Sequence, residues 1–325
     1  MKKKSLFAIF LAIVMLLSLV GCSSAETGSA AESKEETYSV YAVAPESGAS
    51  WTRFKQGLDK ACAELGWEST LVAPQKPYDA VEMAELCDTA VNAGADVIMI
   101  FTADTEFFKD TIEAAKEKGV LMISIAKPNP YCDLRVGTDD TNVGENIAQT
   151  LVDVMGDKPI KVIEMMSDVT SEGQMHQIEP FEAKLKELAP DAEIVDRIDC
   201  SYNAVDGADN LAASYNAHPE ANCVISIDGG GSVGCSSFVS DYGIAGEFVV
   251  ISVEDTAEVL QCLLDGSIQA TVANQWDSFA YQAVYFAQDI LVNGAELEFN
   301  QGVESVVIYP DEVEEYAAAH NISLE

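Results

Sequence analysis

Short apolar runs alternate with amphipathic segments along most of the chain. The apolar runs are rich in aliphatic and β-branched residues, which is typical of strands buried on both faces of a sheet. Between them, apolar side chains recur every three to four positions, which predicts helices, and Gly119 marks the end of one of them. The first series predicts strands at residues 38–44, 69–72, 96–101 and 120–125, and helices at residues 51–65, 80–92 and 105–118.

A second series of the same kind follows in the other half of the chain. It predicts strands at residues 161–166, 193–198, 223–227, 248–253 and 269–273, with helices in the gaps. Strands that alternate with helices in this way form parallel sheets covered on both faces. These strands are too many for one ordinary sheet, so we expect an α/β protein with two doubly wound domains. Ligands of such domains bind beyond the carboxyl ends of the strands.

The charge balance excludes some classes of function. The 325 residues include 54 acidic and 18 basic side chains, for a net charge of −36. Nucleic-acid binding needs cations that displace phosphate counterions, so we expect no nucleic-acid partner. An anionic membrane surface would also repel so acidic a protein. The acidity is most simply explained by solubility, and a partner-docking role for the acidic surface stays open as an alternative.

The first residues have the pattern of an export signal. Residues 2–4 are lysines, residues 6–17 are almost all apolar, and residues 19–22 read Leu-Val-Gly-Cys. We interpret residues 1–22 as a signal peptide. The last four resemble the lipobox of bacterial lipoproteins, which implies cleavage before Cys22 and its acylation. Residues 23–37 lack any apolar period and are predicted to be a disordered tether.

The remaining seven cysteines cannot all pair within one chain, because their number is odd. The sequence has no C-x-x-C and only three histidines, so we predict no metal site. Most of these cysteines fall in apolar strand or helix patterns. We therefore expect buried thiols.

Several segments form an ordered set of motifs along the chain. The first predicted helix begins Trp-Thr-Arg-Phe-Lys-Gln-Gly, and residues 93–100 read Ala-Gly-Ala-Asp-Val-Ile-Met-Ile. Residues 136–144, 217–220 and 265–273 follow. In this order the segments resemble the periplasmic sugar-binding proteins of the ribose-binding type, in which the segment like residues 136–144 is the first hinge crossing. The resemblance covers about residues 38–309.

The resemblance implies a type I periplasmic binding protein fold of venus-flytrap form. Its two doubly wound parallel-sheet lobes would be joined by a three-strand hinge, and ligand would stabilise closure. The first lobe would comprise residues 38–138 and 275–304, and the second residues 139–274 and 305–325. The implied function is that of a solute-binding lipoprotein of an ABC importer, with permease subunits as partners, no catalysis and no cofactor. We expect a monomer that touches the membrane only through its lipid anchor.

The resemblance also implies a set of ligand contacts. Trp51 takes the place of an aromatic residue that stacks on the sugar ring, whose C–H faces pack on aromatic surfaces. Tyr202 matches a second aromatic position. Asp228 and Glu254 end two strands, where carboxylates accept hydrogen bonds from hydroxyl groups. The alternatives are core packing for Trp51, a surface position for Tyr202 and a helix N-cap for Asp228.

The other candidate contacts lie where the chain departs from the family pattern. Lys127 follows Ala126, where the family shows Asp-Arg, and Phe101 stands where ribose binders have an amide. In the loop after residue 166, the family's arginine is replaced by Gln177, with His176 beside it. A hinge amide of the family corresponds to Asn274, with Gln275 as the less favoured neighbour. These departures leave open a sugar, deoxysugar, polyol or furanone-like ligand.

Two other readings of the sequence compete with transport. Residues 229–234 satisfy G-x-G-x-x-G after a strand, and Glu254 lies about 20 residues on, which is typical of an NAD-dependent oxidoreductase. Asp228 would, however, direct a negative charge at a pyrophosphate. The second reading is a sensory receptor that signals to a membrane kinase, and its fold would be the same. No helix-turn-helix pattern precedes the first strand, which argues against DNA-binding relatives.

Overall fold

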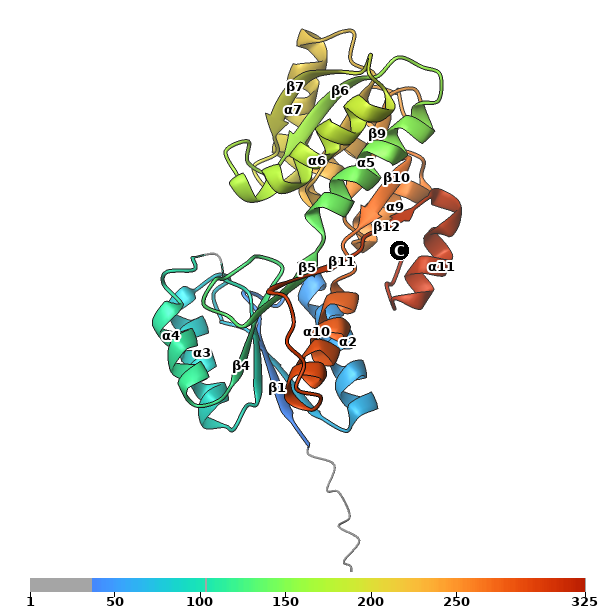
Figure 1. Ribbon diagram of the computed structural model, residues 1–325. Helices are drawn as coiled ribbons and strands as arrows, with labels where there is room; N and C mark the ends of the chain where they lie inside the picture. Colours follow the sequence, from blue (N-terminus) through green and yellow to red (C-terminus); the bar gives the residue numbers. More distant parts are fainter. Residues whose placement is uncertain (1–36, 103, 325) are drawn as a thin grey trace, which may run out of the picture. The chain divides into compact units, whose positions relative to one another are not determined.

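The computed structural model describes residues 37–102 and 104–324. The predicted signal peptide and Cys22, and nearly all of the predicted tether, lie outside the described residues. The described chain forms two six-stranded sheets, with the orders β11-β5-β4-β3-β1-β2 and β12-β10-β9-β8-β6-β7. Neighbouring strands are parallel except β10 and β12 (Figure 1).

The first sheet and its helices, here called the first lobe, are built mainly from the first part of the chain. Its strands are β1 (Ser39–Val43), β2 (Glu68–Val72), β3 (Val97–Ile100), β4 (Leu121–Ile125), β5 (Leu134–Thr138) and β11 (Asn300–Val303). Its helices are α2 (Ala49–Leu65), α3 (Ala80–Asn92), α4 (Lys109–Glu117) and α10 (Trp276–Leu291).

The second sheet and its helices form the second lobe. Its strands are β6 (Lys161–Met166), β7 (Glu193–Asp199), β8 (Cys223–Ser226), β9 (Val249–Val253), β10 (Ala270–Ala273) and β12 (Val306–Ile308). Its helices are α5 (Asp140–Met155), α6 (Glu172–Leu188), α7 (Ala204–Ala217), α8 (Gly229–Asp241), α9 (Ala257–Leu264), the short 3-10 helix η1 (Pro310–Glu312) and α11 (Val313–Ala319).

Alternation of side chains along each strand divides each lobe into two cores. In β3, Val97 and Met99 pack against α2 and α10, whereas Ile98 and Ile100 pack against α3 and α4. Figure 1 shows these two helix pairs on opposite faces of the first sheet. Because both faces are covered, every residue of β3 is buried. The doubly wound α/β class expected from the sequence is confirmed.

The chain passes between the two sheets three times. It leaves β5 of the first sheet for α5, leaves β10 of the second sheet for α10, and passes from β11 directly to β12. Strands β5, β11 and β12 are absent from the strands predicted by the apolar pattern. The helix predicted from residue 105 begins only at Lys109, because residues 105–108 form turns.

All seven cysteines in the described part of the chain are buried and unpaired, as expected. Burial raises the pKa of the Cys87 and Cys223 thiols to about 12, so both stay protonated. Within the described ranges, no three His, Cys, Asp or Glu side chains are arranged to hold a metal ion. A helix long and apolar enough to cross a bilayer is also absent from those ranges.

Candidate functional site

Four aromatic side chains gather beyond the carboxyl ends of the first sheet, and we call them the aromatic group. Trp51 lies in the first turn of α2, Phe101 follows β3, Trp276 begins α10, and Tyr78 lies in the loop before α3. The Trp51 ring centroid is 5.4 Å from that of Trp276 and 6.2 Å from that of Phe101. Phe101 is in turn 6.2 Å from Tyr78.

The members of the aromatic group differ in how much surface they offer. Trp51 is only 4% exposed and packs on Phe54 within the first-lobe core, so most of its ring is structural. Phe101 and Trp276 are half-buried, and Tyr78 is 55% exposed. Lys127 is exposed, and its Nζ lies 5.8 Å from the Phe101 ring centroid. The accessible aromatic surface is therefore shared by several rings.

Asp228 follows β8 of the second lobe and has both carboxylate oxygens engaged. Its Oδ1 accepts hydrogen bonds from the Gly231 amide (2.9 Å) and the Cys200 thiol (3.3 Å), and its Oδ2 accepts one from Ser167 Oγ (2.7 Å). It is the N-cap of α8, the role that the sequence left open as an alternative. A carboxylate oxygen has room for a further donor, so capping and ligand binding are compatible.

Glu254 follows β9 and lies close to the start of α8. Its Cγ would be 3.3 Å from a Cβ placed on Gly229. Its Oε1 accepts a hydrogen bond from Asn274 Nδ2 (2.9 Å). Burial, followed by the charge of Asp255, raises the pKa of Glu254 to about 7.

Asn274 ties this carboxylate to the first lobe. It lies just after β10, and its Oδ1 accepts a hydrogen bond from Thr138 Oγ1 at the end of β5 (3.2 Å). Gln275 adopts a left-handed conformation (φ 52°), and its Nε2 donates to the Glu304 carbonyl (2.9 Å). Each of the two amides therefore links two of the three segments that pass between the sheets, and the Gln275 amide nitrogen is already used in such a link.

A buried ion pair joins the neighbourhoods of Trp51 and Glu254. Arg53 extends from α2 with Nη1 at 2.6 Å from Asp255 Oδ1, and its Nη2 is 2.9 Å from Asp277 Oδ1. Arg53 is 8% exposed and Asp255 is fully buried. Arg53 lies two residues after Trp51, and Asp255 directly follows Glu254. The ion pair therefore holds in place the chain segments that carry these two candidate ligand contacts.

Tyr202 lies in a loop after β7 and is 69% exposed, with a left-handed φ of 61°. Burial, followed by the charges of Asp168 and Asp228, raises the pKa of its phenol. The pKa of Tyr78 is raised by burial and then by the neighbouring Glu46 and Tyr202. Tyr202 thus belongs to the surroundings of both the aromatic group and Asp228.

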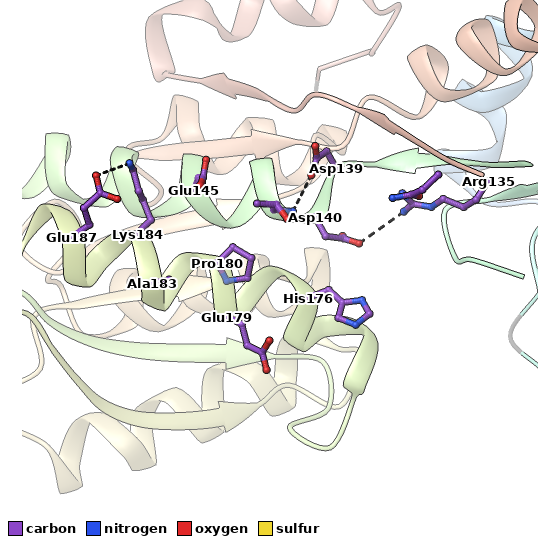
Figure 2. A pocket seen from close by; sticks show the side chains of 12 residues that line it. Arg135, Asp139, Asp140, Glu145, His176, Glu179, Pro180, Ala183, Lys184 and Glu187 are labelled. Atoms are coloured by element: carbon purple, nitrogen blue, oxygen red, sulfur yellow. Dashed lines mark hydrogen bonds and ion pairs between the residues drawn. The ribbon is translucent and has the colours of Figure 1, made fainter. Parts of the chain in front are cut away.

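His176 and Gln177 lie on α6 in a different environment. Gln177 Nε2 donates to Asp140 Oδ1 (2.8 Å), and His176 lines a groove of about 610 Å³ between α5 and α6. Figure 2 shows His176 and Glu179 on α6 and Arg135 at the end of this groove. Its lining shares no residue with the aromatic group or with the Asp228–Glu254 pair.

The glycine-rich run at residues 229–234 is explained by packing. A Cβ on Gly231 would lie 2.8 Å from Met165 Sδ, and one on Gly234 would lie 2.6 Å from the Ala204 carbonyl. These close approaches let α8 pack on β6 and α7. The α8 N-terminus already has a carboxylate cap, which leaves it poorly suited to a pyrophosphate.

Sequence reasoning missed Trp276, Arg53 and Asp255. Trp276 and Asp255 each follow a predicted contact by one residue, and Arg53 lies two residues after Trp51. Trp276 and Asp255 could therefore have been found from their positions just after the ends of predicted strands. No local pattern pairs Arg53 with a residue 202 positions away.

Comparisons with known proteins agree with this architecture. The protein-family model of the periplasmic binding protein domain matches residues 40–296. The ribose import binding protein RbsB of Bacillus subtilis is 20% identical over 239 residues, which are 73% of this chain and 76% of that protein. The xylitol-binding protein of Mycolicibacterium smegmatis is 21% identical over 291 residues, 87% of this chain and 79% of that protein.

A solved structure has the same fold. It is an ABC transporter periplasmic solute-binding protein from Actinobacillus succinogenes with bound D-allose, 16% identical, with a TM-score of 0.75 over 86% of this chain and all of that chain. The family model covers well over half of the sequence, and both lobes have the corresponding architecture. This chain therefore belongs to the periplasmic binding protein family.

Proposed function

We propose that this chain is the solute-binding lipoprotein of an ABC importer. It lies outside the cytoplasm and is anchored to the bacterial cell membrane by a lipid on Cys22. It binds a small sugar or sugar-like molecule and performs no chemistry on it. The observation that carries this proposal is the junction at residues 273–276. There, Asn274 bonds the Glu254 carboxylate, and Trp276, two residues later, packs on Trp51.

This junction combines the two surfaces that a sugar needs. The C–H faces of the ring pack on aromatic side chains, here Phe101, Trp276 and Tyr78 around Trp51. The hydroxyl groups donate to carboxylates, here Asp228 or Glu254. The names of relatives that bind ribose, xylitol and D-allose support the ligand class.

A thermal-shift screen tests the ligand. The panel comprises D-ribose, D-allose, D-arabinose, D-galactose and xylitol at pH 8.0, with NADH as a counter-ligand. A ligand present at about 100 times its Kd adds about 2.7 kcal/mol of stability, which a melting curve resolves. No stabilisation by any sugar or polyol, or stabilisation by NADH alone, contradicts the proposal.

Substitutions locate the binding surface. We expect Phe101→Ala to weaken binding of the best panel ligand by roughly 1–3 kcal/mol, from the apolar contact that is lost. Because Trp51 is buried, Trp51→Ala is the second variant, and it should weaken binding through loss of core packing beneath the aromatic group. Phe107→Ala, an exposed aromatic of the same lobe, is the matched control and should bind normally. Unchanged affinity in both site variants contradicts the aromatic contact.

The anchor is tested separately. Cells that express the full chain and are labelled with a palmitate analogue should yield labelled protein in the membrane fraction. Cys22→Ala should abolish both the label and the membrane association, because the thiol is the proposed acylation site. Equal labelling of the two chains contradicts the lipoprotein assignment.

A further inference from the structure

The Glu254 carboxyl group has one engaged and one unengaged oxygen. Oε1 accepts from Asn274 Nδ2, whereas Oε2 is buried and has no hydrogen-bond partner among the described residues. Most buried polar atoms in folded proteins have a partner, and an unsatisfied one costs about 1–3 kcal/mol. Other atoms of Glu254 are partly exposed, so the buried carboxyl group lies just below the surface near the carboxyl end of β9.

The backbone of Glu254 is strained at the same place. Its φ is 104°, a region that residues other than glycine rarely adopt. The conformation is held by two hydrogen bonds, from the Glu254 amide to the Val272 carbonyl (3.1 Å) and from Thr271 Oγ1 to the Glu254 carbonyl (2.6 Å). Strain of this kind concentrates at functional sites.

The neighbouring amide fixes where a proton on Glu254 must reside. Thr138 Oγ1 donates to Asn274 Oδ1, so Nδ2 is the group that faces Glu254. Nδ2 can only donate, and Glu254 Oε1 therefore acts as an acceptor. When Glu254 is neutral, its proton is on Oε2, the oxygen that lacks a partner.

The charged groups around Glu254 favour this neutral form. Asp255 is the next residue and Asp228 is at the start of α8, and both carboxylates oppose ionisation of Glu254. Arg53 of α2 favours ionisation, but its guanidinium is already paired with Asp255 and Asp277. Burial is the largest cause of the raised pKa of about 7.

Given the proposed function, on which this inference rests, we propose that Glu254 is a proton-linked specificity residue. It releases its carboxyl proton when it accepts a hydrogen bond from a hydroxyl group of the ligand. A ligand hydroxyl donates to the carboxylate, and the carboxyl proton leaves to the solvent. No covalent bond other than this O–H bond changes. The preferred ligand is a neutral polyhydroxyl molecule with a donor hydroxyl at this position. A sugar acid is disfavoured, because its carboxylate would lie close to the carboxylates of Asp228 and Glu254.

Calorimetry of the wild-type chain with the best sugar or polyol of the screen tests this proposal. Titrations between pH 5.5 and 8.0, in two buffers of different ionisation enthalpy, count the protons exchanged. We expect proton release on binding, an affinity that rises by up to about tenfold per pH unit below pH 7, and a plateau above it. Glu254→Gln should remove both effects, and Glu258→Gln, an exposed acid on α9, should retain them.

The outcomes separate this inference from the proposed function. Proton uptake on binding, or binding without proton exchange and with constant affinity, overturns the proton-linked role. Retention of the pH dependence in a folded Glu254→Gln chain overturns the assignment to this residue. If that variant does not fold, the wild-type proton count alone decides. No binding to any sugar or polyol of the panel at pH 8.0 contradicts the proposed function instead.

Discussion

Removal of the Arg53 guanidinium should destabilise the protein strongly, because it leaves a buried charge without its main partner. Asp255 is fully buried, and without Arg53 its remaining side-chain donor is Tyr316 Oη. Breaking a buried pair by removing one partner costs about 3–5 kcal/mol. We therefore expect Arg53→Met to lower the free energy of unfolding by about this amount, as measured by urea denaturation.

A double-mutant cycle shows whether the loss comes from this pair. In Arg53→Met/Asp255→Asn the unpaired charge is also removed, so the double variant should be more stable than the sum of the single effects predicts, by about 1–3 kcal/mol. Lys55→Met is the control on the same helix, because Lys55 pairs with Asp59 where both side chains are 46% exposed. Such a surface pair contributes only about 0.3–0.5 kcal/mol. An Arg53→Met effect no larger than the control, or strictly additive effects, would refute the reasoning.

The remaining predictions concern packing, titration and thiol reactivity. Gly57→Ala should destabilise the first lobe by more than about 1 kcal/mol in urea denaturation, because the new Cβ would lie 1.9 Å from the Asp277 carbonyl oxygen, whereas Gly173→Ala has 3.9 Å of clearance and should not. Burial raises the pKa of Glu164 to about 7, so the folded state binds its proton more tightly than the unfolded state and this contribution to stability falls as pH rises from about 4.5 to 7. The urea midpoint of the wild-type chain should therefore fall as pH rises over that range, and that of Glu164→Gln should fall less. Equal declines of the two midpoints would contradict the assignment. The native protein should react slowly with a thiol reagent, and the seven cysteines of the described residues should react fully in denaturant, since all of them are buried.

Much of the fold could be predicted from the sequence because it depends on local periodicity. Helix α3 has the predicted bounds, Ala80–Asn92, and strand β6 has the predicted bounds, Lys161–Met166. A strand buried on both faces must be apolar at every position, and a covering helix must be apolar on one side, so these elements are recorded in the chain itself. The edge strands β11 and β12 are half exposed and short, and they left no such pattern.

The candidate site could be predicted only in part. Asp228 and Glu254 were found because carboxylates directly follow apolar strands, and a parallel sheet brings those strand ends to one edge. The sequence could not show that Trp51 is mostly core, that Gln275 bonds the Glu304 carbonyl, or that His176 lines a separate groove. These facts depend on which side of each element faces a neighbour.

The sequence by itself determined two largely parallel α/β sheets and the acidic character of the protein, because burial and charge are properties of each segment. Only the tertiary structure decided that Arg53 meets Asp255 and that Glu254 keeps an unpaired oxygen beside Asn274. The physical reason is that such contacts join residues far apart in the chain. They exist only after three crossings have brought the two sheets together, and no local pattern encodes that arrangement.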